Sequence, residues 1–175
     1  MQSPNNSTNV RELVMLSLLI AIALVLSYFE RFIPMNIGVP GVKLGLANVV
    51  TLLCLHIYKP SRIYLLIVVR GFLASVFLGS MMSFWYSLTG GLMSGTAMML
   101  TAWLLKDNVS LIGISAIGAI FHNIGQLIVV TVVTGSFYVA LGYFPMLLIA
   151  GIITGIFIGV VGKLTKPYLV QMVKA

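Results

Sequence analysis

Acidic residues and cysteine are almost absent from this chain. Its 175 residues include a single cysteine, Cys54, and three carboxylates, Glu12, Glu30 and Asp107. One cysteine cannot form a disulfide framework or a thiolate metal cluster within the chain, so we interpret it as a buried apolar thiol. The G-x-x-x-x-G-K-S/T phosphate loop is also missing, so any use of ATP would require partner subunits. We therefore predict no catalytic residues, no metal site and no cofactor.

Charged residues make up only 7% of the chain, whereas 60% of its residues are hydrophobic. With a mean hydropathy of +1.12, this composition excludes an ordinary soluble domain and predicts an integral membrane protein. We expect an all-α fold with a single transmembrane domain over residues 1–175 and a short polar tail at residues 1–10. The hydrophobic runs predict six spanning helices, at residues 13–29, 44–58, 63–78, 81–105, 111–133 and 144–164. The second and third runs are short for a hydrocarbon core of about 30 Å, so broken, re-entrant and sheltered arrangements stay open for them.

The distribution of basic residues between the loops predicts the topology. In a soluble protein a net charge of +7 would suggest a nucleic-acid partner, but here the charges gather at alternate helix ends. Two basic residues, Arg31 and Lys43, fall on one side, and seven fall on the other: Arg11, Lys59, Arg62, Lys106, Lys163, Lys166 and Lys174. By the positive-inside rule both termini are cytoplasmic, and the connections at residues 79–80 and 134–143 are external. We expect a multi-pass protein of the cell membrane, with the lipid bilayer and no nucleic acid as a partner.

Arg70 lies in the middle of the run LLIVVRGFLASVFLG, which has no other charge. Such a charge is costly in hydrocarbon and is usually paired, solvated or functional. The other two acids are assigned to the cytoplasmic helix ends, so Glu30 is the acid available to pair with it. If Arg31 or Lys43 occupies Glu30 instead, Arg70 needs backbone carbonyls, water or an anionic ligand. A structural ion pair and an anion-binding role both stay open.

Polar side chains in the fifth and second predicted helices form another candidate cluster. In the segment GAIFHNIGQL, Asn123 and Gln126 follow His122 at helical angles of about 100° and 40°, so all three side chains can face one cavity. Asn48 and Thr51 are three residues apart and share one face of the second helix. Interhelical hydrogen bonding is the alternative to a ligand pocket for such residues.

The external side of the predicted bundle adds further candidates. Glu30, Lys43, Trp85 and Tyr86 lie toward this side, where an open cavity would bring them near the buried polar groups. The segment IPMNIGVPG, at residues 33–41, has two prolines and two glycines, and we expect it to pack over the helix ends. A mobile lid and a fixed plug are both open interpretations of this segment.

Small residues at four-residue spacing predict close helix contacts. Gly151, Gly155 and Gly159 form such a face in the last helix, and Ser17 and Ala21 form one in the first. We interpret the glycines as helix-packing residues. The first-helix pair is the preferred candidate for a subunit interface, and packing within the chain is its alternative.

Four segments together resemble a known family: PGVKLGLANVVTLL, the arginine-bearing third helix, SLTGG at Ser87 to Gly91, and GAIFHNIGQL, in that order. The chain resembles the bacterial membrane proteins called heptaprenyl diphosphate synthase component I, also called the Gx transporter family, from Leu13 to about Gly162. The resemblance implies a six-helix bundle similar to the substrate-binding S components of energy-coupling-factor (ECF) vitamin transporters.

The family name implies a synthase, but the residues argue against catalysis. The soluble prenyl diphosphate synthases hold diphosphate through magnesium bound to aspartate-rich motifs, and magnesium requires oxygen ligands. This chain has a single aspartate, so we predict that it is not an enzyme.

The similarity to S components implies a ligand near the external face, a lid between the first two helices, and a first helix that contacts a transmembrane coupling subunit working with two ATPases. We therefore predict a subunit that captures a small anionic or amphipathic metabolite from outside. Arg70 would hold the anionic group, His122 and the amides would orient the rest, and Trp85 or Tyr86 would stack on an aromatic or isoprenoid part. The alternative is a non-catalytic membrane subunit that supports isoprenoid or quinone metabolism, or flavin-linked extracellular electron transfer.

Overall fold

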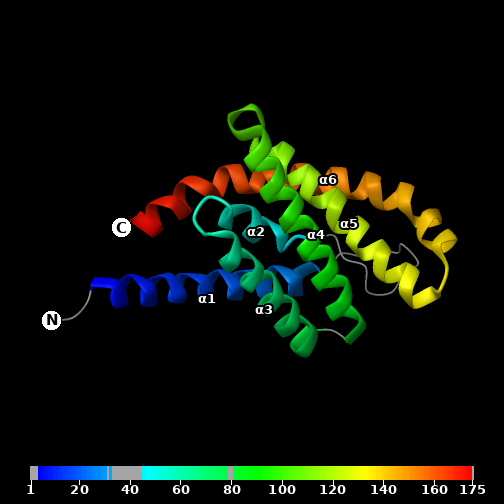
Figure 1. The fold of residues 1–175 in the computed structure, drawn as a ribbon, viewed down its shortest axis with the longest axis horizontal. Helices are drawn as coiled ribbons and strands as arrows, with labels where there is room; N and C mark the ends of the chain where they lie inside the picture. Colours follow the sequence, from blue (N-terminus) through cyan, green and yellow to red (C-terminus); the bar gives the residue numbers. More distant parts are fainter. Residues whose placement is uncertain (1–3, 31, 33–44, 79–80, 175) are drawn as a thin grey trace.

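The structure is a computed structural model that describes residues 4–30, 32, 45–78 and 81–174. Throughout these residues the regular structure is helical, and no strand is present among them. Figure 1 shows the helices as a bundle in which α5 lies between α4 and α6. The helices are α1 (Pro4–Glu30), α2 (Asn48–Cys54), α3 (Pro60–Leu78), α4 (Met81–Leu105), α5 (Leu111–Thr134) and α6 (Phe137–Lys174), with a 3-10 turn η1 (Lys106–Asn108) between α4 and α5.

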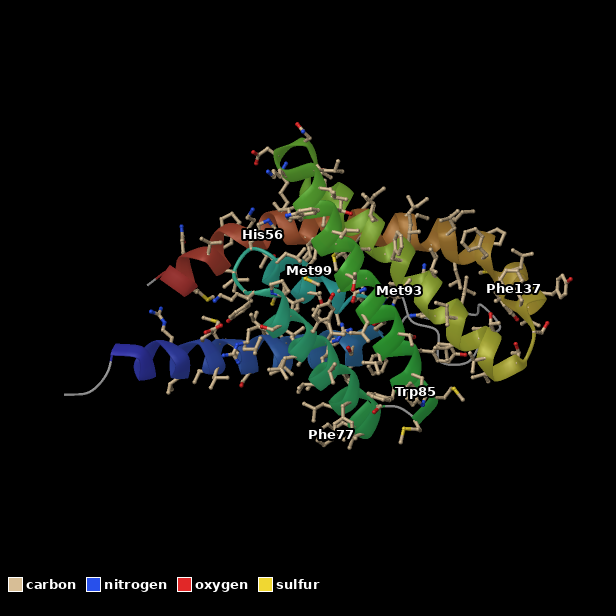
Figure 2. The ribbon with its side chains drawn as sticks, viewed as in Figure 1. His56, Phe77, Trp85, Met93, Met99 and Phe137 are labelled. Atoms are coloured by element: carbon tan, nitrogen blue, oxygen red, sulfur yellow. The ribbon has the colours of Figure 1, made fainter. Side chains whose placement is uncertain are left out.

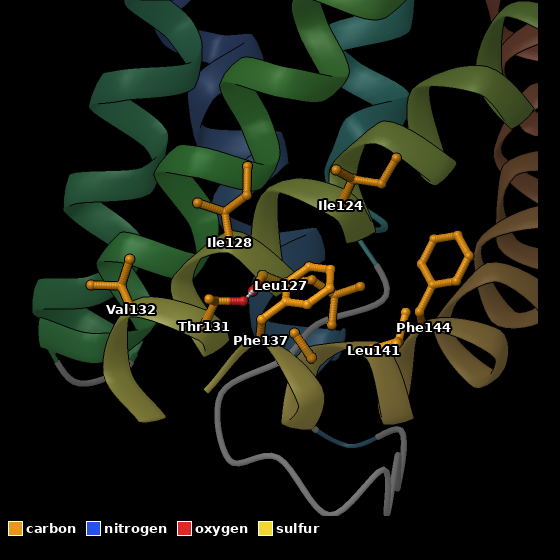
Figure 3. Close-up of a pocket in the computed structure, with 9 residues that line it drawn as sticks. Ile124, Leu127, Ile128, Thr131, Val132, Phe137, Leu141 and Phe144 are labelled. Carbon is orange, nitrogen blue, oxygen red and sulfur yellow. Dashed lines mark hydrogen bonds between the residues drawn. The ribbon is translucent and has the colours of Figure 1, made fainter. Parts of the chain in front are cut away.

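Five helices in the described residues are long and apolar enough to cross a membrane. They are Val10–Glu30, Pro60–Phe77, Met81–Asn108, Leu111–Thr134 and Phe137–Met172. Large apolar side chains stay exposed along them, and Figure 2 shows Phe77, Trp85 and Phe137 at the periphery of the bundle. An exposed apolar surface of this extent fits a lipid environment, where no hydrophobic penalty opposes it. The chain is an all-helical, multi-pass membrane protein.

The second predicted span, at residues 44–58, is much shorter than expected. Only the seven residues Asn48–Cys54 form α2, about 10 Å of helix, so α2 alone is too short to cross about 30 Å of hydrocarbon. Backbone turns follow it as far as Tyr58, and Pro60 then begins α3, a position where the missing N–H of proline costs nothing. Every residue of α2 is buried. Its apolar composition therefore reflects burial inside the bundle.

The last span is longer than predicted, and the loop expected at residues 134–143 is much shorter, because α5 ends at Thr134 and α6 starts at Phe137; the external location of this connection stays a prediction. Gly135 ends α5 in the left-handed conformation, with φ of 65°, which glycine adopts without strain. Helix α6 starts at Phe137 and continues to Lys174, although Pro145 and Pro167 lie inside it. Each proline removes one helical hydrogen bond and favours a bend, and α6 curves along the bundle in Figure 1.

The glycines of α6 lie against α5. A Cβ on Gly155 would be 2.6 Å from Cα of Ala116, and a Cβ on Gly159 would be 2.5 Å from Cα of Ile112. Any larger side chain would therefore have to separate the two helices. Gly151 repeats the contact one turn earlier, beside the amide of Asn123.

The start of α1 and the end of α6 lie at the same end of the bundle (Figure 1). The guanidinium of Arg11 donates to the carbonyl of Met172 at 3.2 Å. Arg62, at the start of α3, forms an ion pair with Glu12 at 3.5 Å. The polar segment expected to be a tail is helical from Pro4 onward, so α1 begins earlier than predicted.

Candidate ligand site around Arg70 and His122

The imidazole of His122 is the centre of a buried hydrogen-bond cluster. The Nδ2 atom of Asn48 is 3.1 Å from its Nδ1 atom, and the Nε2 atom of Gln126 is 2.7 Å from its Nε2 atom. A neutral imidazole has one N–H and one acceptor nitrogen. With Nδ2 of Asn48 donating to Nδ1, the ring hydrogen is on Nε2 and is donated to Gln126, whose amide then presents its oxygen there. Both ring nitrogens are therefore used inside the protein. This holds α2 against α5 and fixes the position of the Asn48 side chain.

Two glycines allow the imidazole to occupy this place. A Cβ on Gly90 of α4 would be 2.8 Å from Cε1 of His122, and a Cβ on Gly45 would be 3.3 Å from the same ring. Gly45 also has φ of 82°, a conformation that L-residues rarely adopt. The ring is thus enclosed between the backbone of α4 and the turn that precedes α2.

Arg70 lies against an adjacent face of the same α4 segment. A Cβ on Gly91, the residue after Gly90, would be 3.2 Å from Nη2 of Arg70. Arg70 is only 4% exposed. Two consecutive glycines of α4 therefore contact the imidazole of α5 and the cation of α3 on faces about 100° apart around one helix.

The guanidinium of Arg70 has no hydrogen bond to another residue in the described part of the chain. Glu30 is also buried and attracts it electrostatically, but no ion pair within 4.0 Å joins them in the described residues. A carboxylate oxygen of Glu30 instead accepts a short hydrogen bond from the backbone N–H of Gly45. Arg70 is 4% exposed, so its guanidinium lies near a negative charge in a buried position and makes no hydrogen bond to a described residue, a situation that is costly for such donors.

Three further buried polar atoms in the described residues have no hydrogen-bond partner: Oδ1 of Asn48, Oγ1 of Thr51 and Oγ of Ser94. Asn48 and Thr51 share one face of α2, as predicted from their spacing, and Ser94 lies on α4 one turn beyond the glycine pair. Buried polar groups are normally hydrogen-bonded, so each of these three atoms is a candidate to accept a hydrogen bond from a bound molecule.

Several predicted site residues lie away from this cluster. The amide of Asn123 donates to the carbonyl of Leu147 in α6 at 2.6 Å, so it is an interhelical hydrogen bond. Trp85 is 49% exposed, with its ring 5.4 Å from that of Phe84, whereas Tyr86 is buried in an apolar cluster between α4, α5 and α6. Lys43 and the segment expected to be a lid lie outside the described residues.

The site also contains residues that the sequence reasoning did not select. Gly45, Gly90 and Ser94 shape or line it, and two of them stand in or beside motifs that carried the family resemblance. The sequence patterns that could have identified the two glycines are the Gly-Gly pair of SLTGG and the G-x-x-N spacing at the start of α2. No group of three or more His, Cys, Asp or Glu side chains that could hold a metal occurs within the described ranges.

This arrangement defines a multi-pass helical membrane protein whose described residues include a buried polar cluster and the buried cation of Arg70. Residues 19–165 match the family model described as heptaprenyl diphosphate synthase component I. The chain therefore belongs to the heptaprenyl diphosphate synthase component I family, which confirms the resemblance seen in its motifs. Neither the curated proteins nor the solved structures compared with it gave a significant match.

Proposed function

We propose that this protein is a substrate-binding membrane subunit that captures a small anionic or amphipathic metabolite, with Arg70 as the anchor of its anionic group. One observation carries the proposal: the Arg70 guanidinium is buried without a hydrogen-bond acceptor in the described chain. A carboxylate or phosphate oxygen would supply that acceptor in a charge-assisted, bidentate geometry that suits arginine. Glu30 would limit the charge of the empty site and exclude a second anion.

The remaining polar atoms would orient the ligand. Asn48 Oδ1 accepts hydrogen bonds, and the hydroxyls of Thr51 and Ser94 can accept or donate. His122 and Gln126 hold Asn48 in place rather than meeting the ligand themselves, because both ring nitrogens are already engaged. Removal of His122 should therefore weaken binding indirectly, through the freedom that Asn48 gains.

The transporter part of the proposal rests on α1. Only 22% of the membrane-spanning window of α1 is buried inside the protein, against 50% of the window of α5. Ser17 and Ala21 are exposed on the outward face of α1. Small residues on an unpacked face allow close approach of another helix. We propose this face as the contact for a transmembrane coupling subunit that acts with two ATPases, as in ECF S components. The same proposal includes six membrane crossings, with the buried α2 and its flanking segments as the second. It also includes cytoplasmic termini and a location in the cell membrane.

Mass spectrometry of the purified protein tests the ligand proposal. The protein is extracted in mild detergent, and its retained small molecules are compared between wild type and Arg70→Gln. Arg62→Gln is the matched control, since Arg62 is the other arginine of α3 and forms only a partly exposed ion pair with Glu12. We expect an anionic compound in wild type and Arg62→Gln that is lost from Arg70→Gln. Equal retention by all three proteins would exclude Arg70 as the anchor.

The family description favours a second candidate function, since it names a component of heptaprenyl diphosphate synthase. In this version the chain is a non-catalytic membrane subunit that supports isoprenoid or quinone metabolism, or flavin-linked extracellular electron transfer. Co-purification separates the two candidates. A coupling subunit with two ATPases supports capture, whereas a prenyl synthase or flavoprotein partner supports the second function.

A further inference from the structure

A polar cavity lies toward the end of the bundle where α1 starts and α6 ends. Its volume is about 530 Å³. The turn after α2, the end of α4 with η1, the start of α5, and α6 together form its walls. The lining residues are Leu55, His56, Ala102, Lys106, Asp107, Val109, Leu111, Ile114 and Lys166. None of them belongs to the site around Arg70.

Three nitrogen-bearing side chains and one carboxylate meet in this cavity. Lys106 comes from η1 and Lys166 from α6, so two ammonium groups from separate elements face one space. Burial lowers the pKa of His56 below its usual 6.5, the charge of Lys166 lowers it further, and a backbone hydrogen bond with Leu52 opposes both effects. His56 is therefore a neutral hydrogen-bonding group near pH 7, and Asp107 balances one of the two ammonium charges.

The backbone of Lys106 is strained. Its φ is 43°, and it is the one non-glycine residue with positive φ in the described part of the chain. An L-residue other than Asn or Asp in this region costs about 1 to 2 kcal/mol. Glycine would make the same turn without that cost, so lysine at this position lowers stability relative to glycine. Strain of this kind collects at functional positions.

We propose that this cavity binds the phosphodiester of a headgroup that also carries a hydroxyl or ammonium donor. Lys106 and Lys166 would hold the phosphate oxygens, with His56 as a further hydrogen-bond partner. Asp107 would accept from the hydroxyl or ammonium group of the same headgroup. The apolar walls, including Val109 and Ile114, would contact the glycerol and the first methylenes of a lipid. A phosphatidylglycerol-type lipid and a free glycerophosphodiester share this chemistry.

Lys163 provides an internal comparison. It lies on α6 close to Lys166 but is exposed to solvent, and it does not line the cavity. A general attraction of anionic headgroups to the basic end of the protein would depend on both lysines alike. A specific site depends on Lys166 and not on Lys163.

The test is a binding titration on the full chain in neutral detergent. The probes are dihexanoyl phosphatidylglycerol, dihexanoyl phosphatidylcholine and free glycerophosphoglycerol. Binding is followed by tryptophan fluorescence, to which Trp103, one turn before Lys106, contributes. The proteins are wild type, Lys106→Gln, Lys166→Gln, Asp107→Asn and the control Lys163→Gln.

We expect saturable binding of phosphatidylglycerol that weakens about fivefold in each of Lys106→Gln and Lys166→Gln and is unchanged in Lys163→Gln. Asp107→Asn should lose the preference for phosphatidylglycerol over phosphatidylcholine, whose choline group is no donor. Binding of the lipid alone identifies a lipid site, and equal binding of glycerophosphoglycerol identifies a headgroup site open to the free diester. Absence of saturation, or an equal loss in Lys163→Gln and Lys166→Gln, would overturn the proposal.

Discussion

Replacing Arg70 by methionine distinguishes a guanidinium held by the protein from one held by a ligand. Methionine keeps much of the length and apolar volume of the side chain and removes its charge. If Arg70 serves mainly as the partner of Glu30, its removal strands a buried carboxylate, which typically costs about 3 to 5 kcal/mol of unfolding free energy. If Arg70 lacks adequate partners in the empty protein, an apolar replacement should be neutral or stabilising by about 1 to 4 kcal/mol.

The structure favours the second outcome. Glu30 accepts from the N–H of Gly45, so it keeps a hydrogen bond after Arg70 is replaced, whereas Arg70 has no acceptor among the described residues. We therefore expect ligand-free Arg70→Met to unfold at an equal or higher denaturant concentration than ligand-free wild type. The retained ligand should at the same time be lost from the variant.

Equilibrium unfolding in mixed micelles, followed by circular dichroism, measures this difference, and mass spectrometry verifies that both samples are ligand-free. Arg62→Met, which removes only a partly exposed ion pair, should change the unfolding free energy by less than about 1 kcal/mol. A loss of about 3 to 5 kcal/mol in Arg70→Met that a second substitution, Glu30→Gln, restores would show a structural ion pair and refute the reasoning.

Three further predictions concern packing and pH. Gly155→Ala should lower the unfolding free energy by about 1 to 3 kcal/mol, because its Cβ would overlap the α5 backbone. The control Gly142→Ala, whose Cβ would have no atom within 4 Å, should be neutral or stabilising. Thermal unfolding of the two variants measures the difference. Gly90→Ala should displace the imidazole of His122 and weaken ligand retention. The control Gly71→Ala, whose Cβ would be 3.9 Å from its nearest neighbours, should retain the ligand. Stronger ligand retention by Gly90→Ala than by Gly71→Ala would argue against a site supported by the imidazole. Because the pKa of His56 in the folded protein is lowered from 6.5, the stability contributed by the neutral imidazole is complete above pH 6.5 and is lost as pH falls through the folded pKa. The melting temperature should therefore decline between pH 8 and pH 5, and His56→Gln should reduce this decline.

The sequence indicated which polar side chains are buried because they stand out against apolar helices. Arg70, Asn48 and His122 are all buried in the structure, since a charge or amide in such a helix turns toward the bundle interior rather than lipid. Their convergence around α4 follows from that constraint. The glycine pair that separates the cation from the imidazole depends on how α4 packs, which a single sequence does not reveal.

Two errors in the predicted site have a shared geometric cause. Asn123 follows His122 by about 100° around the helix, an arc wide enough for the two side chains to face different neighbours, and the amide turns to α6. Trp85 and Tyr86 are adjacent in the same way, so one is exposed and the other buried. Position along the membrane normal had grouped Trp85 with Tyr86, and an arc of about 100° had been accepted as one face for Asn123; rotation about the helix axis separates the residues in both cases.

The errors in the spans have a different cause. Hydropathy measures whether a segment avoids water, and it does not distinguish a helix that crosses lipid from one enclosed by protein. Helix α2 is enclosed, so its apolar run overstated its length. Helix α6 continues through Pro145 and Pro167, where the sequence alone favoured a boundary or a bend.

The length of α6 has a consequence for the surrounding bilayer. Its 38 residues extend about 57 Å, nearly twice the hydrocarbon thickness of about 30 Å. The end of the helix with Lys163, Lys166 and Lys174 is assigned to the aqueous side, and the apolar part before it is still longer than a perpendicular span needs, which favours tilt or curvature. Because Asn123 holds the carbonyl of Leu147 and Gly155 contacts α5 directly, a change in tilt would also shift the helix that carries His122. Membrane thickness would thus become a physical input to the site, and we expect its affinity to differ between bilayers of short and long acyl chains.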